Sequence, residues 1–469
     1  MNYINEDSIA ALSSAAGKAA IAVIRLSGGD SFEIIDKIFQ AKSGRTAAVK
    51  EDPAPDKQIK YGYIVDGVEK IDEVLCAFFK APRTYTGENI VEISAHGNPV
   101  IVSGILNLLY KNGARAAQAG EFTYRAFING KKDLAQAEAV CALIAGKTEK
   151  AVKAALNNLG GEFSNKIKSV KDALINLLAY TEASLDHPEE DIMFLSRAQK
   201  SRKLSDLIDQ NSKLLSAYKI SQCLQKGLKA AIIGKPNTGK SSLLNAIIGK
   251  NRAIVTEIAG TTTDAIEETI DCRGLPLTII DTAGLRNHTN NAVEKLGQEK
   301  TREILSAADI IIWVIDGSQP LDKNDEEIAE ILQNYETPII IAANKSDIKR
   351  ANFETALPAV KRLFSVSHSL LSLSAKTGEC VAELLDAAAK IAGVSDSNGN
   401  IMISARHYAL LQTAQTALEN AKKQYEAQDA DEIAAFEMRN AVSAYEDILG
   451  ITAPHDILDS IFSTFCIGK

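Results

Sequence analysis

The sequence lacks the features of a secreted, membrane-spanning or strongly cationic protein. Its six cysteines are scattered and none forms a CxxC pair, which argues against a disulfide framework and a zinc site. No apolar run is long enough to cross a bilayer, and the opening MNYINEDSIAAL lacks the basic segment of a signal peptide. The net charge is -8, so any RNA contact needs a local patch or a partner. We expect a cytoplasmic protein that does not bind membranes.

The hydrophobic pattern predicts several domains in a chain of 469 residues. IKYGYIVDG and VLCAFFK flank a DG turn and predict a hairpin in an α+β N-terminal part. Ala/Leu-rich helical periodicity starts near residue 123 and returns at residue 405. Between these stretches, short apolar runs alternate with helical segments, which is typical of a doubly wound parallel sheet.

We therefore predict a multidomain α/β plus α fold. A helical domain is interrupted by an inserted P-loop α/β domain, and a separate α+β domain precedes it. The predicted boundaries are 1–122 for the N-terminal domain, 123–226 and 394–469 for the helical domain, and 227–393 for the insert.

One segment of the insert has the pattern of a phosphate-binding loop. GKPNTGKS (234–241) matches G-x-x-x-x-G-K-[ST], follows an apolar run and opens a helical segment. Main-chain N–H groups at the start of such a helix bind phosphate oxygens. We expect Lys240 to reach the β- and γ-phosphates and Ser241 to bind Mg²⁺.

Three further motifs follow in order and indicate guanine specificity. In DTAG (281–284), Asp281 can hold Mg²⁺ through water and the Gly284 N–H can meet the γ-phosphate. NKSD (344–347) places Asp347 where a carboxylate accepts hydrogen bonds from the guanine N1–H and 2-amino group, a donor pair that adenine lacks. SAK (374–376) can offer a main-chain N–H to the guanine oxygen. The order resembles that of translation-factor-like GTPases, so we expect a GTP hydrolase.

Leu285 stands where many such enzymes have a Gln that orients the attacking water. Three explanations are open: no hydrolysis, a residue supplied by a partner, or an ion. Two features favour an ion. The Asn237 side-chain oxygen can bind a monovalent cation near the phosphates, although it can equally make a hydrogen bond that stiffens the loop. VTEIAGTTTD (255–264) offers carbonyls and hydroxyls that could complete a cage for K⁺.

Over nearly its full length the chain resembles the MnmE (TrmE) family of tRNA-modification GTPases. The resemblance rests on GKPNTGKSSLLNAI, AIVTEIAGTTTD, IIDTAGLR, NKSD and the terminal FCIGK, and on IAVIRLSG, TYTGENIVEISAHG and GEFTYRAFINGKKDLAQAEA in the first part. It implies a K⁺-dependent GTPase whose N-terminal domain binds folate and forms a homodimer. It also implies C5 modification of the tRNA wobble uridine (U34) to an aminomethyl or carboxymethylaminomethyl form, in a heterotetramer with the flavoprotein MnmG (GidA).

The resemblance assigns roles to individual residues. It implies K⁺ ligands at Asn237, Thr256, Ile258 and Thr261, Mg²⁺ ligands at Ser241 and Thr262, and a water-orienting acid at Glu294, which by itself could be a solvated helix charge. A tetrahydrofolate derivative (5-formyl- or methylene-) would contact Arg25, Glu92, Lys131 and Lys469. Cys466 in the CIGK ending is a candidate catalytic thiol, although a single cysteine is often an incidental small hydrophobe.

The predicted GTP-binding residues come from the phosphate loop, the switch loop, DTAG, NKSD and SAK. They are Asn237, Thr238, Gly239, Lys240, Ser241, Ser242, Thr256, Glu257, Ile258, Ala259, Gly260, Thr261, Thr262, Asp281, Thr282, Ala283, Gly284, Asn344, Lys345, Asp347, Ser374, Ala375 and Lys376.

Two other functions fit part of this pattern. An rRNA-binding ribosome-assembly GTPase would share the nucleotide motifs, but it predicts a basic RNA-binding module after them, where this chain has a helical tail of mixed charge. A folate-binding scaffold with a vestigial GTPase domain is disfavoured because Lys240, Ser241, Asp281 and Asp347 are all present.

Overall fold

The computed structural model describes residues 7–42, 56–186, 195–250, 267–281, 301–348, 369–391, 393, 401–427 and 431–469. It divides into two compact units. Unit 1 contains Met1–Cys141, Ser164–Asp186 and Ala435–Lys469, and unit 2 contains Ala142–Phe163 and His187–Ala434. The four predicted segments divide the chain differently, and their boundaries stay predictions. None of the helices described combines the length and apolar character that crossing a membrane requires.

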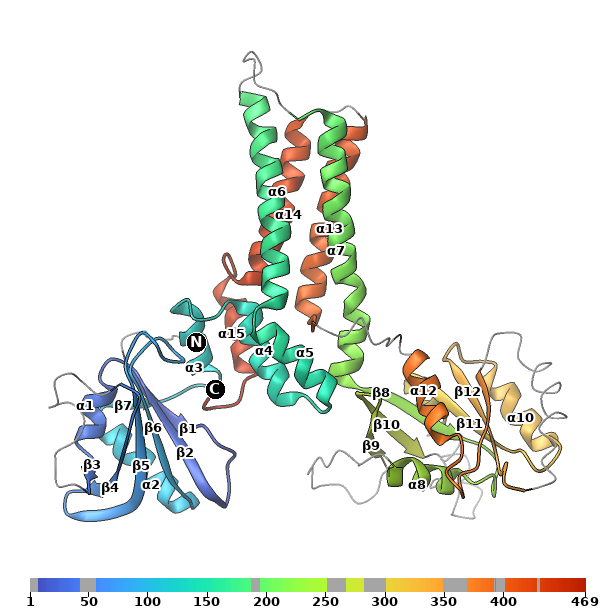
Figure 1. The fold of residues 1–469 in the computed structure, drawn as a ribbon, viewed down its shortest axis with the longest axis horizontal. Coiled ribbons are helices and arrows are strands. Elements are labelled where there is room, and N and C mark those ends of the chain that lie inside the picture. Colours follow the sequence, from blue (N-terminus) through green and yellow to red (C-terminus); the bar gives the residue numbers. More distant parts are fainter. Residues whose placement is uncertain are drawn as a thin grey trace. The chain divides into compact units, whose positions relative to one another are not determined.

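Unit 1 is built on a seven-stranded sheet, drawn in blue in Figure 1, with the strand order β3-β4-β5-β6-β2-β1-β7. The strands are β1 (Ser8–Leu12), β2 (Ala19–Ser27), β3 (Phe39–Ala41), β4 (Gln58–Asp66), β5 (Glu69–Phe79), β6 (Ile90–Gly97) and β7 (Ala114–Ala116). Helices α1 (Ser31–Asp36) and α2 (Pro99–Lys111) pack on one face, where Ile105 and Leu109 share a core with Ile24 and Phe78.

Local sequence signals explain two elements of this unit. The predicted hairpin is confirmed: β4 and β5 pair antiparallel across a turn in which Gly67 has a φ of 64°. Helix α2 starts where expected, because the Asn98 side chain accepts a hydrogen bond from the Val100 N–H and Pro99 occupies the first turn.

Shorter elements cover the other face of the sheet beside β1. Phe122 from α3 (Glu121–Ile128) packs with Ile9, Ala11 and Ala117. Helix α15 (His455–Ser463) lies against α3, with the Phe462 ring edge-on to Tyr124 at a centroid distance of 5.3 Å. Three further described helices have part of their length in this unit: α4 (Leu134–Ala145), α6 (Glu162–Asp186) and α14 (Asp431–Leu449).

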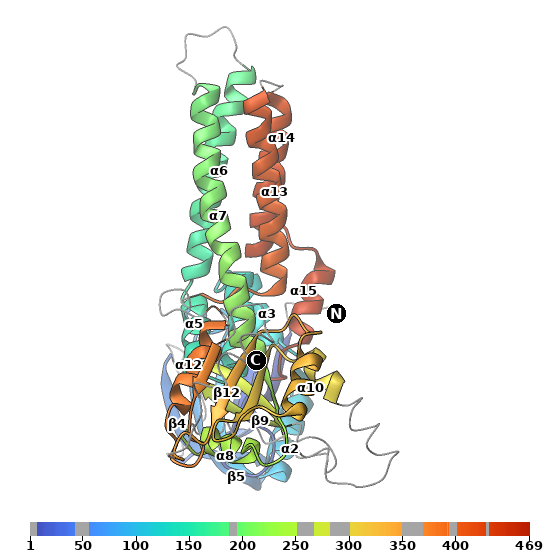
Figure 2. The same ribbon diagram turned by 90° about the vertical axis from the view of Figure 1, so that its right-hand side faces the viewer.

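Unit 2 contains the predicted α/β sheet, with six strands in the order β13-β12-β11-β8-β10-β9. The strands are β8 (Leu228–Ile233), β9 (Glu267–Cys272), β10 (Leu275–Asp281), β11 (Ile310–Asp316), β12 (Ile339–Asn344) and β13 (Ser369–Ser372). The helices are α5 (Glu149–Leu159), α7 (Arg197–Lys226), α8 (Lys240–Lys250), α10 (Lys323–Leu332), α12 (Val381–Ile391) and α13 (Ala405–Ala427), and α13 runs beside α7 (Figure 2).

Strand β9 departs from the expected parallel sheet. It pairs antiparallel with β10, whereas β8, β10, β11, β12 and β13 pair parallel with one another. The cause is the turn at Arg273 and Gly274, whose φ angles of 55° and 87° are both positive. Two successive residues with positive φ form the tight turn that joins antiparallel strands, so β9 becomes an antiparallel edge.

The tip of this hairpin is bound to helix α5. Thr148, which is 4% exposed, accepts a hydrogen bond from the Ala151 N–H at 3.3 Å and thereby caps α5. The same hydroxyl donates to the Gly274 carbonyl at 2.8 Å. One hydroxyl therefore starts the helix and holds the hairpin against it.

Replacing Thr148 should separate these two roles. We expect Thr148→Val to lower the free energy of unfolding by about 2 kcal/mol, because it removes the cap and leaves the Gly274 carbonyl without this donor. Thr148→Asp should fall between Val and wild type, since a carboxylate caps a helix but cannot donate to a carbonyl. Urea unfolding of the full chain measures the order, with Thr148→Ser as the control. A Val variant as stable as the Ser variant would contradict this account.

Candidate functional site

The phosphate loop connects the end of β8 to the start of α8, as its motif predicts. Lys240 is 9% exposed, and its ammonium donates to the carbonyls of Gly234 and Lys235, both at 2.9 Å. Gly239 has a φ of 94°, and a Cβ there would lie 2.2 Å from the Asn344 Nδ2 atom. The loop thus requires glycine at this position because another strand end approaches it closely.

Asn344 is the residue that makes this approach, at the end of β12. Its amide nitrogen donates to the Thr238 carbonyl and its amide oxygen accepts from the Ala375 N–H, both at 2.8 Å. The side chain is 3% exposed. The structure therefore brings together the phosphate loop, NKSD and SAK, three of the motifs that the sequence singled out.

The side chains around the expected guanine position are also oriented by hydrogen bonds. The buried Ser374 hydroxyl donates to Asp347 Oδ1 at 2.7 Å, which leaves the other carboxylate oxygen available to a base. Lys345 donates to Asp316 Oδ2 at 2.6 Å. Burial alone would raise the pKa of Asp316, but Lys345 and Ser318 outweigh it and hold that pKa below its usual range. The Ala375 N–H is engaged by Asn344, so a bond to the guanine oxygen would require sharing it or using Lys376.

The metal and water-orienting predictions fall only partly within the described residues. Asn237 is exposed, has a φ of 62°, and its side chain makes no hydrogen bond within the described part of the chain. Asn237 thus has an exposed amide in the phosphate loop, and the exposed Ser241 and Ser242 open α8. Of Asp281 only the main chain is described, at the end of β10. The remaining predicted residues lie outside the described residues: Thr256, Glu257, Ile258, Ala259, Gly260, Thr261, Thr262, Thr282, Ala283, Gly284 and Glu294.

The predicted folate residues lie in unit 1, and two of them are in direct contact. Arg25 and Glu92 face each other on paired strands, with Glu92 Oε1 accepting from Arg25 Nε at 3.0 Å and Nη2 at 2.8 Å. Glu92 Oε2 has no hydrogen-bond partner among the described residues. The Arg25 guanidinium lies 5.3 Å from the centre of the Tyr85 ring. A free carboxylate oxygen beside an aromatic ring and a cation fits a pterin, which presents donors on its edge.

Lys131 and Lys469 also belong to unit 1. Lys131 follows α3, where a Cβ added to Gly87 would lie 3.2 Å from the Lys131 side chain. Lys469 ends a tail in which Ile467 bridges to Ala119 and the Gly468 carbonyl accepts from the Ser13 hydroxyl at 3.0 Å. Cys466 in this tail is exposed. Mainly burial, and next Cys466, raise the pKa of Cys141 to about 12, so Cys141 stays a thiol at neutral pH.

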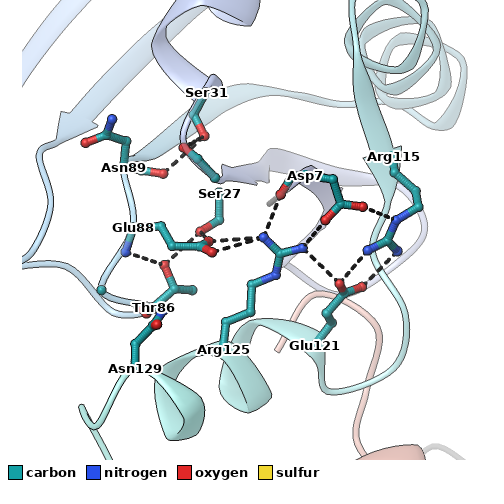
Figure 3. Close-up of polar contacts among 12 residues, drawn as sticks. Asp7, Ser27, Ser31, Thr86, Glu88, Asn89, Arg115, Glu121, Arg125 and Asn129 are labelled. Atoms are coloured by element: carbon teal, nitrogen blue, oxygen red, sulfur yellow. Dashed lines mark hydrogen bonds and ion pairs between the residues drawn. The ribbon is translucent and has the colours of Figure 1, made fainter. Parts of the chain in front are cut away.

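A partly buried charge network that the motifs did not single out supports this region (Figure 3). Arg125, 2% exposed, donates to Asp7 Oδ1 at 2.6 Å, to Glu121 Oε1 at 3.1 Å and to Glu88 Oε1 at 3.1 Å. Arg115 bonds the other oxygen of Asp7 at 2.6 Å and also Glu121 Oε1 at 2.6 Å. Because Glu88 belongs to the loop that carries Tyr85, the network fixes that loop on α3 and on the segment before β1.

Comparison with known proteins identifies the family. The model named "MnmE helical domain" matches residues 134–466, and the model named "GTP-binding protein TrmE N-terminus" matches residues 8–131. A "tRNA modification GTPase MnmE" from Endomicrobium trichonymphae is 58% identical over 472 residues, covering 100% of both chains. The chain belongs to the MnmE family.

Other members of the MnmE family match over the same extent. The protein of that name from Aquifex aeolicus is 40% identical and covers 98% of this chain and 99% of its own length. The one from Clostridioides difficile is 38% identical and covers 99% of each. Both relatives align with the N-terminal, helical and inserted segments together, so the resemblance inferred from the motifs is confirmed for the whole chain.

The charge network predicts a loss of stability in acid. Burial alone would raise the pKa of Asp7, but hydrogen bonds from Arg115 and Arg125 outweigh it and lower that pKa below its unfolded value. The stabilisation is therefore complete above pH ~4 and is lost as pH falls through the folded-state pKa.

Asp7→Asn should make unit 1 less stable at pH 7 and reduce the dependence of its unfolding on pH below ~4. Unfolding free energies measured by urea titration between pH 2 and 7 check this. Asp30→Asn is the matched control, because the exposed Asp30 side chain does not cap α1. Equal acid sensitivity in Asp7→Asn and wild type would contradict the role given to the network.

Proposed function

We propose that this chain is a potassium-activated GTPase that takes part in modifying the wobble uridine of tRNA. The observation that supports the nucleotide part is the position of Asn344, whose amide bonds the phosphate loop and the SAK loop at the same time. In this proposal Lys240 serves the phosphate side and Asp347 the base side of one site. The tRNA part follows from the name of the relatives, with which the chain aligns from end to end.

In this proposal, separate side chains bind the guanine base and the phosphates of GTP. Asp347, oriented by Ser374, accepts from the guanine edge, and an adenine would leave the carboxylate without its two donors. On phosphate binding, the Lys240 ammonium exchanges its bonds to the Gly234 and Lys235 carbonyls for bonds to phosphate oxygens. The start of α8 contributes main-chain N–H groups, and Ser241 would hold Mg²⁺.

Catalysis needs a substitute for the missing glutamine. We propose that Asn237 holds a K⁺ ion with Thr256, Ile258 and Thr261, and that Glu294 orients the attacking water. K⁺ supplies positive charge between the phosphates, as an arginine finger does. Thr262 would complete the Mg²⁺ coordination with Ser241. The free Asn237 amide supports this proposal, because the side chain is not used to stiffen the loop within the described residues.

The tRNA reaction would use unit 1. A tetrahydrofolate derivative would contact Arg25, Glu92, Lys131 and Lys469 and would supply a one-carbon unit. Cys466 is the candidate thiol at this site. We propose that the chain acts as a cytoplasmic homodimer and adds an aminomethyl or carboxymethylaminomethyl group at C5 of U34 together with the flavoprotein MnmG, in a heterotetramer.

Turnover in potassium and sodium tests the GTPase proposal. We expect GTP hydrolysis by the full chain to be at least roughly tenfold faster in KCl than in NaCl, because the cation replaces a catalytic charge. Asn237→Ala should remove most of this difference, and Glu294→Ala should lower kcat about 100-fold while GTP still binds. Equal rates in the two salts, or full activity of Glu294→Ala, would refute the mechanism.

Mass spectrometry of tRNA tests the modification. Cells lacking this protein should lose the aminomethyl-type groups at U34, and the intact gene should restore them. A Lys240→Ala variant should fail to restore them, because loss of the phosphate-binding ammonium prevents GTP binding. Normal U34 modification in the deletion strain would contradict the tRNA proposal while leaving the GTPase proposal open to its own test.

A further inference from the structure

Lys235, the second residue of the phosphate loop, makes an ion-pair cluster that none of the predicted roles includes. Its ammonium lies 2.7 Å from Asp325 Oδ2 and 2.9 Å from Asp322 Oδ2, both at the start of α10. The Lys235 side chain is 17% exposed and the Asp325 side chain 1% exposed. The Asp322 side chain is 51% exposed, so only the Lys235–Asp325 pair is much less accessible to water than an ordinary surface ion pair, and water screens that pair less.

The two carboxylates also begin helix α10. Asp322 is its N-cap and accepts from the N–H groups of Asn324 at 3.0 Å and Asp325 at 3.2 Å. Asp325 Oδ2 accepts in return from the Asp322 N–H at 3.2 Å, which completes a capping box. Asp325 Oδ1 has no hydrogen-bond partner among the described residues. Among the described residues, Lys235 is the cation that balances the charge of the buried Asp325 carboxylate.

The main chain of Lys235 contacts the other side of the loop. Its carbonyl accepts from the Lys240 ammonium at 2.9 Å and from the Thr238 hydroxyl at 3.0 Å. The same residue therefore joins α10, through its side chain, to the turn that carries the phosphate-binding lysine, through its carbonyl. In the proposed GTP complex the Lys240 ammonium turns to the phosphates, so the Thr238 hydroxyl is the bond through which a displacement of Lys235 would shift that turn.

We propose that Lys235 is a positioning residue for GTP binding, which anchors the first turn of the phosphate loop to the start of α10. This inference rests on the proposed function only in that the chain must bind GTP. Lys235 acts through the loop conformation and does not touch the reacting atoms. Its loss should therefore weaken GTP binding more than it slows the chemical step.

The test compares variants of the full chain by steady-state GTP turnover in KCl and by binding of a fluorescent GTP analogue. Lys235→Met should raise KM and the Kd of the analogue roughly tenfold and leave kcat within about threefold. Lys235→Arg should stay within about twofold of wild type, because a guanidinium can bond both carboxylates. Lys422→Met is the control: it removes a partly exposed lysine of the same unit, paired with Glu426 at 3.5 Å.

A double variant separates anchoring from charge balance. Lys235→Met leaves a buried carboxylate without its cation, and adding Asp325→Asn removes that charge. We expect the double variant to regain thermal stability but to keep most of the loss in GTP affinity. If the double variant regained the full GTP affinity of wild type, GTP binding would depend on balancing the Asp325 charge and not on anchoring by Lys235. That result would overturn the proposal.

The outcomes also separate this inference from the proposed function. If wild type binds GTP and Lys235→Met binds it equally well, the positioning role is wrong even where the variant melts at a lower temperature. If wild type does not bind GTP at all, the proposed function itself fails. Failure of Lys235→Arg to restore affinity would likewise contradict anchoring by the two carboxylates.

Discussion

The nucleotide site depends on two hydrogen bonds made by one buried amide. Asn344 ends β12, while Thr238 and Ala375 belong to loops that follow β8 and β13. The carboxyl ends of parallel strands lie at the same edge of a sheet. The strands do not determine how the loops beyond that edge fold. An amide has a donor and an acceptor at fixed geometry, so Asn344 can join two loops that neither a carboxylate nor an ammonium could join.

Most of unit 2's sheet and much of the site could be predicted because they follow from local signals. Apolar runs indicate buried parallel strands, and the phosphate-loop, NKSD and SAK motifs each carry their chemistry within a few residues. The antiparallel strand β9 was not predicted. Its signal is the Arg-Gly pair at 273–274, but only the positive φ of both residues shows that the chain reverses there. Lys235 was likewise not singled out, because its partners Asp322 and Asp325 lie 87 and 90 residues away in the sequence.

The network around Arg125 shows a different limit of sequence analysis. Glu121 and Arg125 are spaced as an ordinary helix-surface ion pair, which is typically worth little. In the structure Glu121 is 0% exposed and Arg125 is 2% exposed, so their charges must be compensated within the protein. Asp7 and Glu88 supply part of that compensation from distant segments. Burial, which depends on tertiary packing, converts a weak local pair into the support for the loop that carries Tyr85.

Helix α5 precedes the inserted α/β segment in the sequence, and it packs firmly against the β9–β10 hairpin of that segment. Ala151, Ala154 and Ala155 belong to the same core cluster as Ile270 and Leu275 of the β9–β10 hairpin. Small side chains let a helix approach a sheet edge closely, and Thr148 adds a hydrogen bond at the hairpin tip. In the sequence, β9 comes shortly after the predicted switch loop (255–264), and β10 ends at Asp281, the first residue of DTAG. A helix outside the α/β segment is therefore packed on the hairpin that lies between two motifs predicted to bind the nucleotide, so a shift of either strand must be accommodated by α5.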